Sequence, residues 1–200
     1  MRLSAKRKVV GFSLLELLVA MVVALILLAI ALPIFMRAYR VYQLNNAARE
    51  VADILRLARY EAIRLNKPVN CVVQSTGGTP PTTNVWVDSN PPNGTLDPGE
   101  KMILLTSGGN LVDASSVPGT PGMLAAAINS GASFAPSASS SSVTFDARGA
   151  TKSPALLTVN VFYLSNASAP DAGYRAVLLM PAGGIQIWSS DQTGNWQQLR

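Results

Sequence analysis

One carboxylate stands at the edge of a membrane-length apolar segment, and this arrangement limits what the chain can become. Glu16 follows Gly11-Phe12-Ser13-Leu14-Leu15 and directly precedes an uncharged run from Leu17 to Met36. As a helix that rises about 1.5 Å per residue, this run covers roughly the 30 Å of bilayer hydrocarbon. A carboxylate beside hydrocarbon is costly, so Glu16 needs a partner or a functional role. The sequence predicts one membrane-spanning helix with an acid at its start.

A basic N-terminus precedes this junction. Arg2, Lys6, Arg7 and Lys8 lie within the first eight residues. Clustered bases beside a membrane segment favour a cytoplasmic N-terminus, which predicts export of the chain beyond the helix. These four bases also account for most of the formal net charge of +5. The excess of basic over acidic residues therefore indicates membrane topology rather than nucleic-acid binding.

Together these residues resemble the type IV prepilin signature, a short basic leader that ends in Gly and is followed by Phe and then by Glu as the fifth mature residue. The resemblance implies cleavage between Gly11 and Phe12 by a prepilin peptidase, N-methylation of Phe12 and retention of the apolar helix. It also implies that Glu16 pairs with the N-terminal amine of a neighbouring subunit, where opposite charges in hydrocarbon stabilise each other. Pro33 stands where pilins tend to carry a helix-loosening proline, and it predicts a kink or local unwinding.

A competing cleavage signal lies further along the apolar run. Ala29-Ile30-Ala31 has the small-x-small form of a general secretory cleavage site. Cleavage there would release a secreted soluble domain that begins at Leu32. This alternative is disfavoured because it leaves Glu16 inside the apolar region and makes the Gly-Phe-x-x-x-Glu spacing accidental.

An amphipathic helix is predicted after the apolar run. Its apolar residues recur every three or four positions and form one stripe: Leu44, Ala48, Val51, Leu55, Ala58, Ala62 and Leu65. Asn66-Lys67-Pro68 is expected to end the helix, because the residue before proline avoids the helical region. The predicted segments are a leader at 1–11, a transmembrane helix at 12–36 and a stalk helix at 37–67. The stripe also fits a short coiled-coil seam, but packing against a sheet is favoured because strand-like segments follow at once.

The remaining residues, 68–200, predict a β-rich head. Seven segments rich in β-branched and aromatic residues read as strands: Val69 to Gln74, Val85 to Asp88, Met102 to Thr106, Val143 to Asp146, Leu156 to Leu164, Tyr174 to Met180 and Ile185 to Trp188. Helix first and strands after predict an α+β fold, with the stalk packed on an antiparallel sheet. The stretch 107–142 is rich in Gly, Ser, Ala and Pro, so we expect a flexible loop with one short helix around Met123 to Ile128.

The residue inventory argues against catalysis. The chain has no histidine, which removes Ser-His-Asp and Cys-His nucleophiles and any imidazole metal site. Its one cysteine, Cys71, cannot form an intramolecular disulfide, and we expect it buried in a strand. We therefore predict no enzymatic activity and no cofactor.

One acidic stretch offers oxygen ligands around a glycine. Asp88, Asn90, Asp97 and Glu100 are weak calcium candidates. Their spacing departs from helix-flanked calcium loops, and prolines occupy ligand positions, so a hydrogen-bonded hairpin turn is favoured and no metal is predicted. A general acid and base pair is the other chemical interpretation of these carboxylates, but no second feature supports it.

Three further features resemble the GspH/FimT family of minor pseudopilins: the helix-to-strand passage from Ala58 to Val69, Trp86 with the acidic stretch after it, and Phe145-Asp146-Ala147-Arg148-Gly149. The resemblance implies a structural subunit of a type II secretion pseudopilus or type IV pilus, at or near the filament tip. It implies a single-pass protein of the bacterial inner membrane, with its head periplasmic or extracellular. Its partners would be the prepilin peptidase, the cytoplasmic membrane and other pilin-type subunits.

DNA binding is the alternative function. Members of the FimT kind bind DNA during uptake through arginines near the C-terminal end. Here the matching region, Gly183 to Trp188, has no arginine. The segment 37–67 has seven bases and three acids, but the head from Pro68 has five bases and seven acids. A solvated or subunit-facing helix surface is therefore favoured over a phosphate-binding one.

Overall fold

The computed structural model describes residues 13–76, 82–89, 92–105, 108–120, 122–128, 133–136, 140–152 and 158–199. The chain forms two compact units, Met1–Ala38 and Tyr39–Arg200. Helix α1 (Leu14–Leu65) supplies residues to both units. In the first unit, every described residue is exposed.

The ends of α1 follow from local chemistry. Ser13 caps its start, because the Ser13 hydroxyl accepts a hydrogen bond from the N–H of Glu16 at 3.1 Å. At the other end Asn66 adopts a positive φ of 50°, and the N–H of Lys67 bonds to the carbonyl of Ala62 at 3.3 Å. The helix ends at Leu65, directly before the predicted stop at Asn66-Lys67-Pro68. The helix continues through Pro33, so the chain is not unwound there, and the alternative expectation of a kink stays a prediction.

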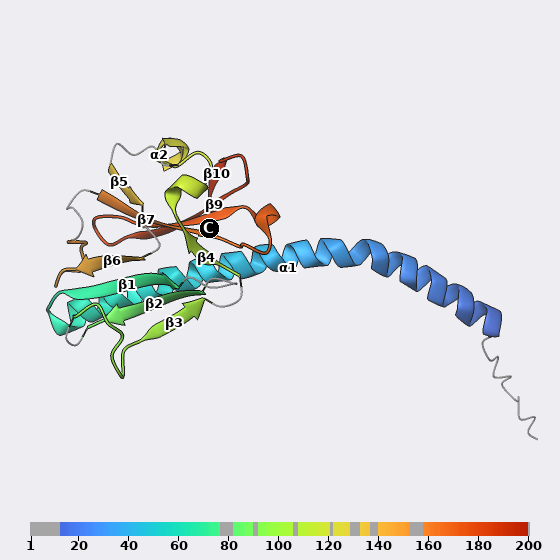
Figure 1. The fold of residues 1–200 in the computed structure, drawn as a ribbon, viewed down its shortest axis with the longest axis horizontal. Helices are drawn as coiled ribbons and strands as arrows, with labels where there is room; N and C mark the ends of the chain where they lie inside the picture. The colour runs from blue at the N-terminus through green and yellow to red at the C-terminus, as the bar shows by residue number, and fades with distance from the viewer. Residues whose placement is uncertain are drawn as a thin grey trace, which may run out of the picture. The chain divides into compact units, whose positions relative to one another are not determined.

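Two β-sheets pack against one side of the second part of α1 (Figure 1), whose other side stays exposed. The first sheet is antiparallel, has the order β3-β2-β1-β6, and consists of β1 (Val69–Thr76), β2 (Thr82–Asp88), β3 (Met102–Leu105) and β6 (Ser140–Phe145). The second sheet has the order β10-β9-β8-β7-β4 and consists of β4 (Asn110–Val112), β7 (Thr158–Ser165), β8 (Tyr174–Leu179), β9 (Ile185–Ser190) and β10 (Trp196–Leu199). A further strand, β5 (Ser133–Pro136), pairs in parallel with β7.

The main hydrophobic core lies between the stalk part of α1 and both sheets. Six of the seven predicted stripe residues are fully buried there: Leu44, Ala48, Val51, Leu55, Ala58 and Ala62. Leu65, the seventh, is partly buried against the same core. The expected packing of an amphipathic helix on a sheet is confirmed, and so is the α+β fold class.

A smaller core covers the opposite face of the second sheet. Val161 and Tyr163 of β7 face this side, and Leu124 of the short helix α2 (Gly122–Ile128) packs over them. Phe162 and Leu164 of the same strand face α1. Strand β7 is therefore buried on both faces, which explains its nearly continuous apolar sequence.

The structure corrects the predicted loop at 107–142. It contains β4, a 3-10 turn η1 (Ala114–Ser116), α2, β5 and the start of β6, of which only the short helix was predicted. Tertiary pairing explains these elements: Ser142 pairs with Val72 of β1, and the N–H of Leu111 in β4 donates to the Thr83 hydroxyl at 3.0 Å. Such short polar strands form because neighbouring strands offer main-chain hydrogen bonds, and their composition does not predict them.

Two further expectations need correction. The head has two sheets instead of one, and β5 adds a parallel pair to an otherwise antiparallel arrangement. Strand β10 was not predicted, because its sequence Trp196-Gln197-Gln198-Leu199 lacks a strand-like composition. Another 3-10 turn, η2 (Pro170–Ala172), precedes β8.

Candidate functional site

The first candidate site is the exposed apolar part of α1. Between Ser13 and Met36 the only charged residue is Glu16, and large apolar side chains such as Leu14 and Ile34 are 83% and 66% exposed. This helix has a mean hydropathy of 3.1 over its most apolar window and is long enough to cross a membrane. Apolar surface of this extent requires lipid or other apolar helices around it.

Glu16 lies in the first turn of this helix. Its own N–H is held by Ser13, so the turn is fixed by a local cap. An acid in a first turn also interacts favourably with the positive end of the helix dipole, which is a local reason for its position. The proposed cleavage and methylation residues, Gly11 and Phe12, lie outside the described part of the chain. Pro33 lies within the helix, on its exposed surface.

The acidic stretch forms a self-contained turn. Asp88 is fully buried, and its two carboxylate oxygens accept hydrogen bonds from the N–H groups of Asn93 at 3.1 Å and Gly94 at 2.7 Å. Glu100 accepts from the N–H groups of Ser89 at 2.8 Å and Asp97 at 3.1 Å. These bonds are those that the hairpin-turn interpretation requires.

The calcium candidates do not form a ligand cluster in the part of the chain that the structure describes. No group of three or more His, Cys, Asp or Glu side chains there could hold a metal ion. Asp97 accepts a hydrogen bond from the side-chain amide of Asn93 at 2.9 Å. Asn90 lies outside the described residues. The donors already satisfy Asp88, so a cation would have to displace main-chain N–H groups.

Three of the seven bases of the stalk have identified partners within the chain. Arg56 lies 2.6 Å from Asp53, and Arg64 lies 2.6 Å from Glu61. Arg59 donates from Nη1 to the carbonyl of Gly183 at 3.0 Å. Phosphate binding requires several available cations on one face, so these contacts weaken the nucleic-acid alternative.

Sequence reasoning missed the contact between Arg59 and two glycine turns. Gly149 and Gly183 have φ values of 77° and 79°, and a Cβ on either would meet the Arg59 side chain within 2.9 Å. The first turn is held by Asp146, which accepts from the N–H groups of Arg148 and Ala150, both at 2.9 Å. The Phe145–Gly149 motif thus has a structural role, namely to fit a tight turn against α1. The glycines themselves were the only available signal.

Cys71 is buried in β1, as predicted. Burial raises the pKa of its thiol to about 12, because the thiolate would lose its hydration. A thiol of this kind is unreactive at neutral pH. Cys71 therefore acts as a small apolar core residue.

These features define a class of protein: a pilin-type subunit, in which an exposed N-terminal apolar helix continues into a helix packed on β-sheets. Within this class the chain belongs to the GspH family of type II transport proteins, whose family model matches residues 47–184. The prokaryotic N-terminal methylation motif matches residues 7–32. The predicted family and the role of a minor pilin or pseudopilin are confirmed, and this family is a structural one.

Two solved structures are similar in fold. Both are crystal structures of the type IV minor pilin FimU of Pseudomonas aeruginosa strain PAO1, in two space groups, and each is 17% identical in sequence. One alignment covers 78% of this chain and 98% of FimU with a TM-score of 0.41. The other covers 80% and 94% with a TM-score of 0.42. A comparison with curated proteins gave no match.

Proposed function

We propose that this chain enters its filament through α1, with Glu16 paired to the methylated Phe12 amine of a neighbouring subunit. The observation that carries the proposal is an exposed apolar segment, residues 14–36 of α1, whose sole charged residue, Glu16, lies in the first turn of the helix. In lipid or in a helix bundle, an opposite charge is the partner that stabilises this carboxylate most strongly. Cleavage between Gly11 and Phe12 would create that charge four residues before Glu16.

The chain would reach the filament in three steps. The basic leader holds the N-terminus in the cytoplasm while α1 spans the inner membrane and the second unit is exported. Prepilin peptidase then removes residues 1–11. The helix finally leaves lipid and joins a bundle of like helices. Pro33 removes one main-chain hydrogen-bond donor, so the helix can bend more easily at this point as it packs in the bundle.

The family favours a type II secretion pseudopilus over a type IV pilus, since the matching model describes a type II transport protein. We place the subunit at or near the tip, as the minor pseudopilin resemblance implies. Its head would then be periplasmic or extracellular, and the neighbouring subunits would be its direct partners.

The test replaces Glu16 in the full chain, expressed in cells with its assembly machinery. We expect Glu16→Ala and Glu16→Gln to insert normally in the membrane but to lower filament incorporation about tenfold or more, because an uncompensated amine would remain. Glu16→Asp should retain part of the incorporation. Glu61→Ala, a partly exposed acid of the stalk, is the matched control and should have no effect. Unchanged incorporation of Glu16→Ala would contradict the pairing.

A further inference from the structure

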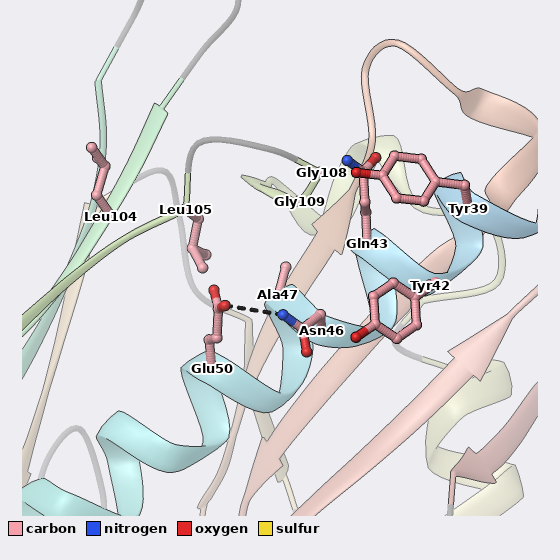
Figure 2. Close-up of a pocket in the computed structure, with 10 residues that line it drawn as sticks. All are labelled: Tyr39, Tyr42, Gln43, Asn46, Ala47, Glu50, Leu104, Leu105, Gly108 and Gly109. Atoms are coloured by element: carbon pink, nitrogen blue, oxygen red, sulfur yellow. Dashed lines mark hydrogen bonds between the residues drawn. The ribbon is translucent and has the colours of Figure 1, made fainter. Parts of the chain in front are cut away.

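A cavity of about 290 Å³ lies in the second unit, beside the first turns of the stalk (Figure 2). One wall is α1 from Tyr39 to Glu50, and the other is the end of β3 with Gly108 and Gly109. The two tyrosines of this stretch, Tyr39 and Tyr42, are 50% and 61% exposed. The cavity therefore opens to the surface with aromatic rings at its border.

The loop side of the cavity lies directly against the helix. A Cβ on Gly108 would lie 2.5 Å from the Cβ of Gln43, and a Cβ on Gly109 would lie 2.5 Å from that of Ala47. No other residue type fits at these two positions without a shift of the backbone. Because Gly108 and Gly109 lie so close to α1, the main chain of these two residues forms one fixed side of the cavity.

Glu50 supplies the one charged group of the cavity. Its carboxylate accepts a hydrogen bond from the side-chain amide of Asn46 at 3.2 Å, which Figure 2 draws as a dashed line. Among the residues that the structure describes, no lysine or arginine pairs with Glu50. Burial, and then the nearby charge of Asp53, raise the pKa of Glu50. The carboxylate thus lacks a cation that would stabilise its charged form.

We propose that this cavity receives a lysine or arginine side chain from a neighbouring filament subunit. The Glu50 carboxylate is suited to a cationic group, through a charge-assisted hydrogen bond. The rings of Tyr39 and Tyr42 lie about two to three helical turns earlier on α1 and border the other end of the cavity, where they can contact the rest of the incoming chain. A long flexible stem would also cover the apolar edge that Leu104 and Leu105 provide. A small anion or an acidic peptide is disfavoured, because Glu50 would repel it.

The position of the cavity along the chain supports this partner. Tyr39 follows Met36, the last residue of the apolar run, by three positions. This inference rests on the proposed function: if subunits pack through residues 14–36, the next turns of α1 approach the neighbouring stalks. Stalks of this kind carry bases, since this chain has seven in residues 37–67.

The experiment places the photoreactive residue p-benzoylphenylalanine at Tyr42 of the full chain, in cells with its assembly machinery. This substitution keeps an aromatic ring at the border of the cavity. We expect a cross-link to a pilin-type subunit, and mass spectrometry should find a lysine or arginine beside the linked position. Glu50→Gln should lower the yield about tenfold, as expected for loss of a half-buried charge pair. Glu61→Gln, a partly buried acid with its own partner Arg64, should leave the yield unchanged.

A second probe at Leu25 separates this inference from the proposed function. If Leu25 cross-links to filament subunits and Tyr42 does not, the cavity proposal is wrong and the assembly proposal stands. If neither position cross-links, both proposals are wrong. The cavity proposal is also overturned if the yield of the Tyr42 cross-link is the same in Glu50→Gln, or if the linked peptide has no lysine or arginine near the linked position. Once the base of the partner subunit is identified, a charge swap provides a further test. Glu50→Lys in this chain, combined with replacement of the partner's base by Glu, should restore the yield.

Discussion

Arg59 of α1 donates a hydrogen bond from Nη1 to the main-chain oxygen of Gly183, which lies 124 positions further along the chain, at 3.0 Å. Gly183 follows β8 in a turn whose carbonyl at Pro181 accepts from the N–H of Thr151 at 2.9 Å. The same turn therefore contacts the helix and the segment after β6. This contact joins the stalk to both sheets, so we expect the stalk and head to unfold together.

The Arg59 contact predicts that Gly183→Ala is strongly destabilising. The new Cβ would collide with the carbonyl oxygen of Gly149 and would require a positive φ, so we expect a loss of about 2–4 kcal/mol in the free energy of unfolding. Gly184→Ala is the control, because its Cβ would meet only Met180, at 3.9 Å. Tryptophan fluorescence during denaturant unfolding measures both. Equal stability of the two variants would contradict this account of the turn.

A second long-range contact predicts a cost for Asn45→Ala. The Asn45 side-chain oxygen accepts a hydrogen bond from Nε of Arg175 at 2.5 Å, and Arg175 is only 5% exposed. Without this acceptor the buried guanidinium loses a partner, so we expect a loss of about 1–3 kcal/mol. Asn46→Ala, at an exposed neighbouring position, should change stability by less than about 0.5 kcal/mol. Similar losses for both variants in thermal unfolding would refute a specific role for Arg175.

Sequence patterns predicted the parts of the fold that depend on local periodicity. The stripe from Leu44 to Ala62 specified which helix face is buried, and Asn66-Lys67-Pro68 specified where the helix ends. Strands with β-branched runs, such as β7, were also predictable. Strands β4, β5 and β10 were not, because each is short and forms only where a neighbouring strand offers main-chain partners.

The candidate sites also differ in whether a local sequence pattern predicts them. The Gly11–Glu16 spacing is a linear motif and can be found in a sequence. The Arg59 contact and the cavity around Glu50 cannot, because they bring α1 together with Gly183 and with Gly108, far along the chain. Only the packed structure reveals such pairs.

The turn interpretation of the acidic stretch predicts no response to calcium. Asp88 already accepts two main-chain hydrogen bonds, so millimolar calcium should leave the melting temperature unchanged in the wild type and in Asp97→Ala. Asp88→Ala should lower stability by about 1–3 kcal/mol with or without calcium, because it removes the acceptor that holds the N–H groups of Asn93 and Gly94 in the turn. A calcium-dependent rise in melting temperature that disappears in Asp97→Ala would mean a true metal site.

Burial of Cys71 predicts a loss of stability at alkaline pH. The folded-state pKa of the thiol is raised to about 12, so the thiol favours the folded state fully below its ordinary value of 9.0. As pH rises from about 9 towards 12, the unfolded state ionises first and stability falls, by at most about 1.4 kcal/mol per pH unit. The variant Cys71→Ala should lack this component, although Tyr163, whose pKa is also raised to about 12, adds its own above pH 10. If the free energy of unfolding depends on pH in the same way in the wild type and in Cys71→Ala, the thiol does not contribute as described.

The mature N-terminus tests the central claim most directly. We expect mass spectrometry of the protein purified from membranes of cells with a prepilin peptidase to find N-methylated Phe12 as the first residue, with α1 intact behind it. The amine that Glu16 needs would then be present. A mature chain that begins at Leu32, or one that keeps Met1 and the whole leader, would contradict the account.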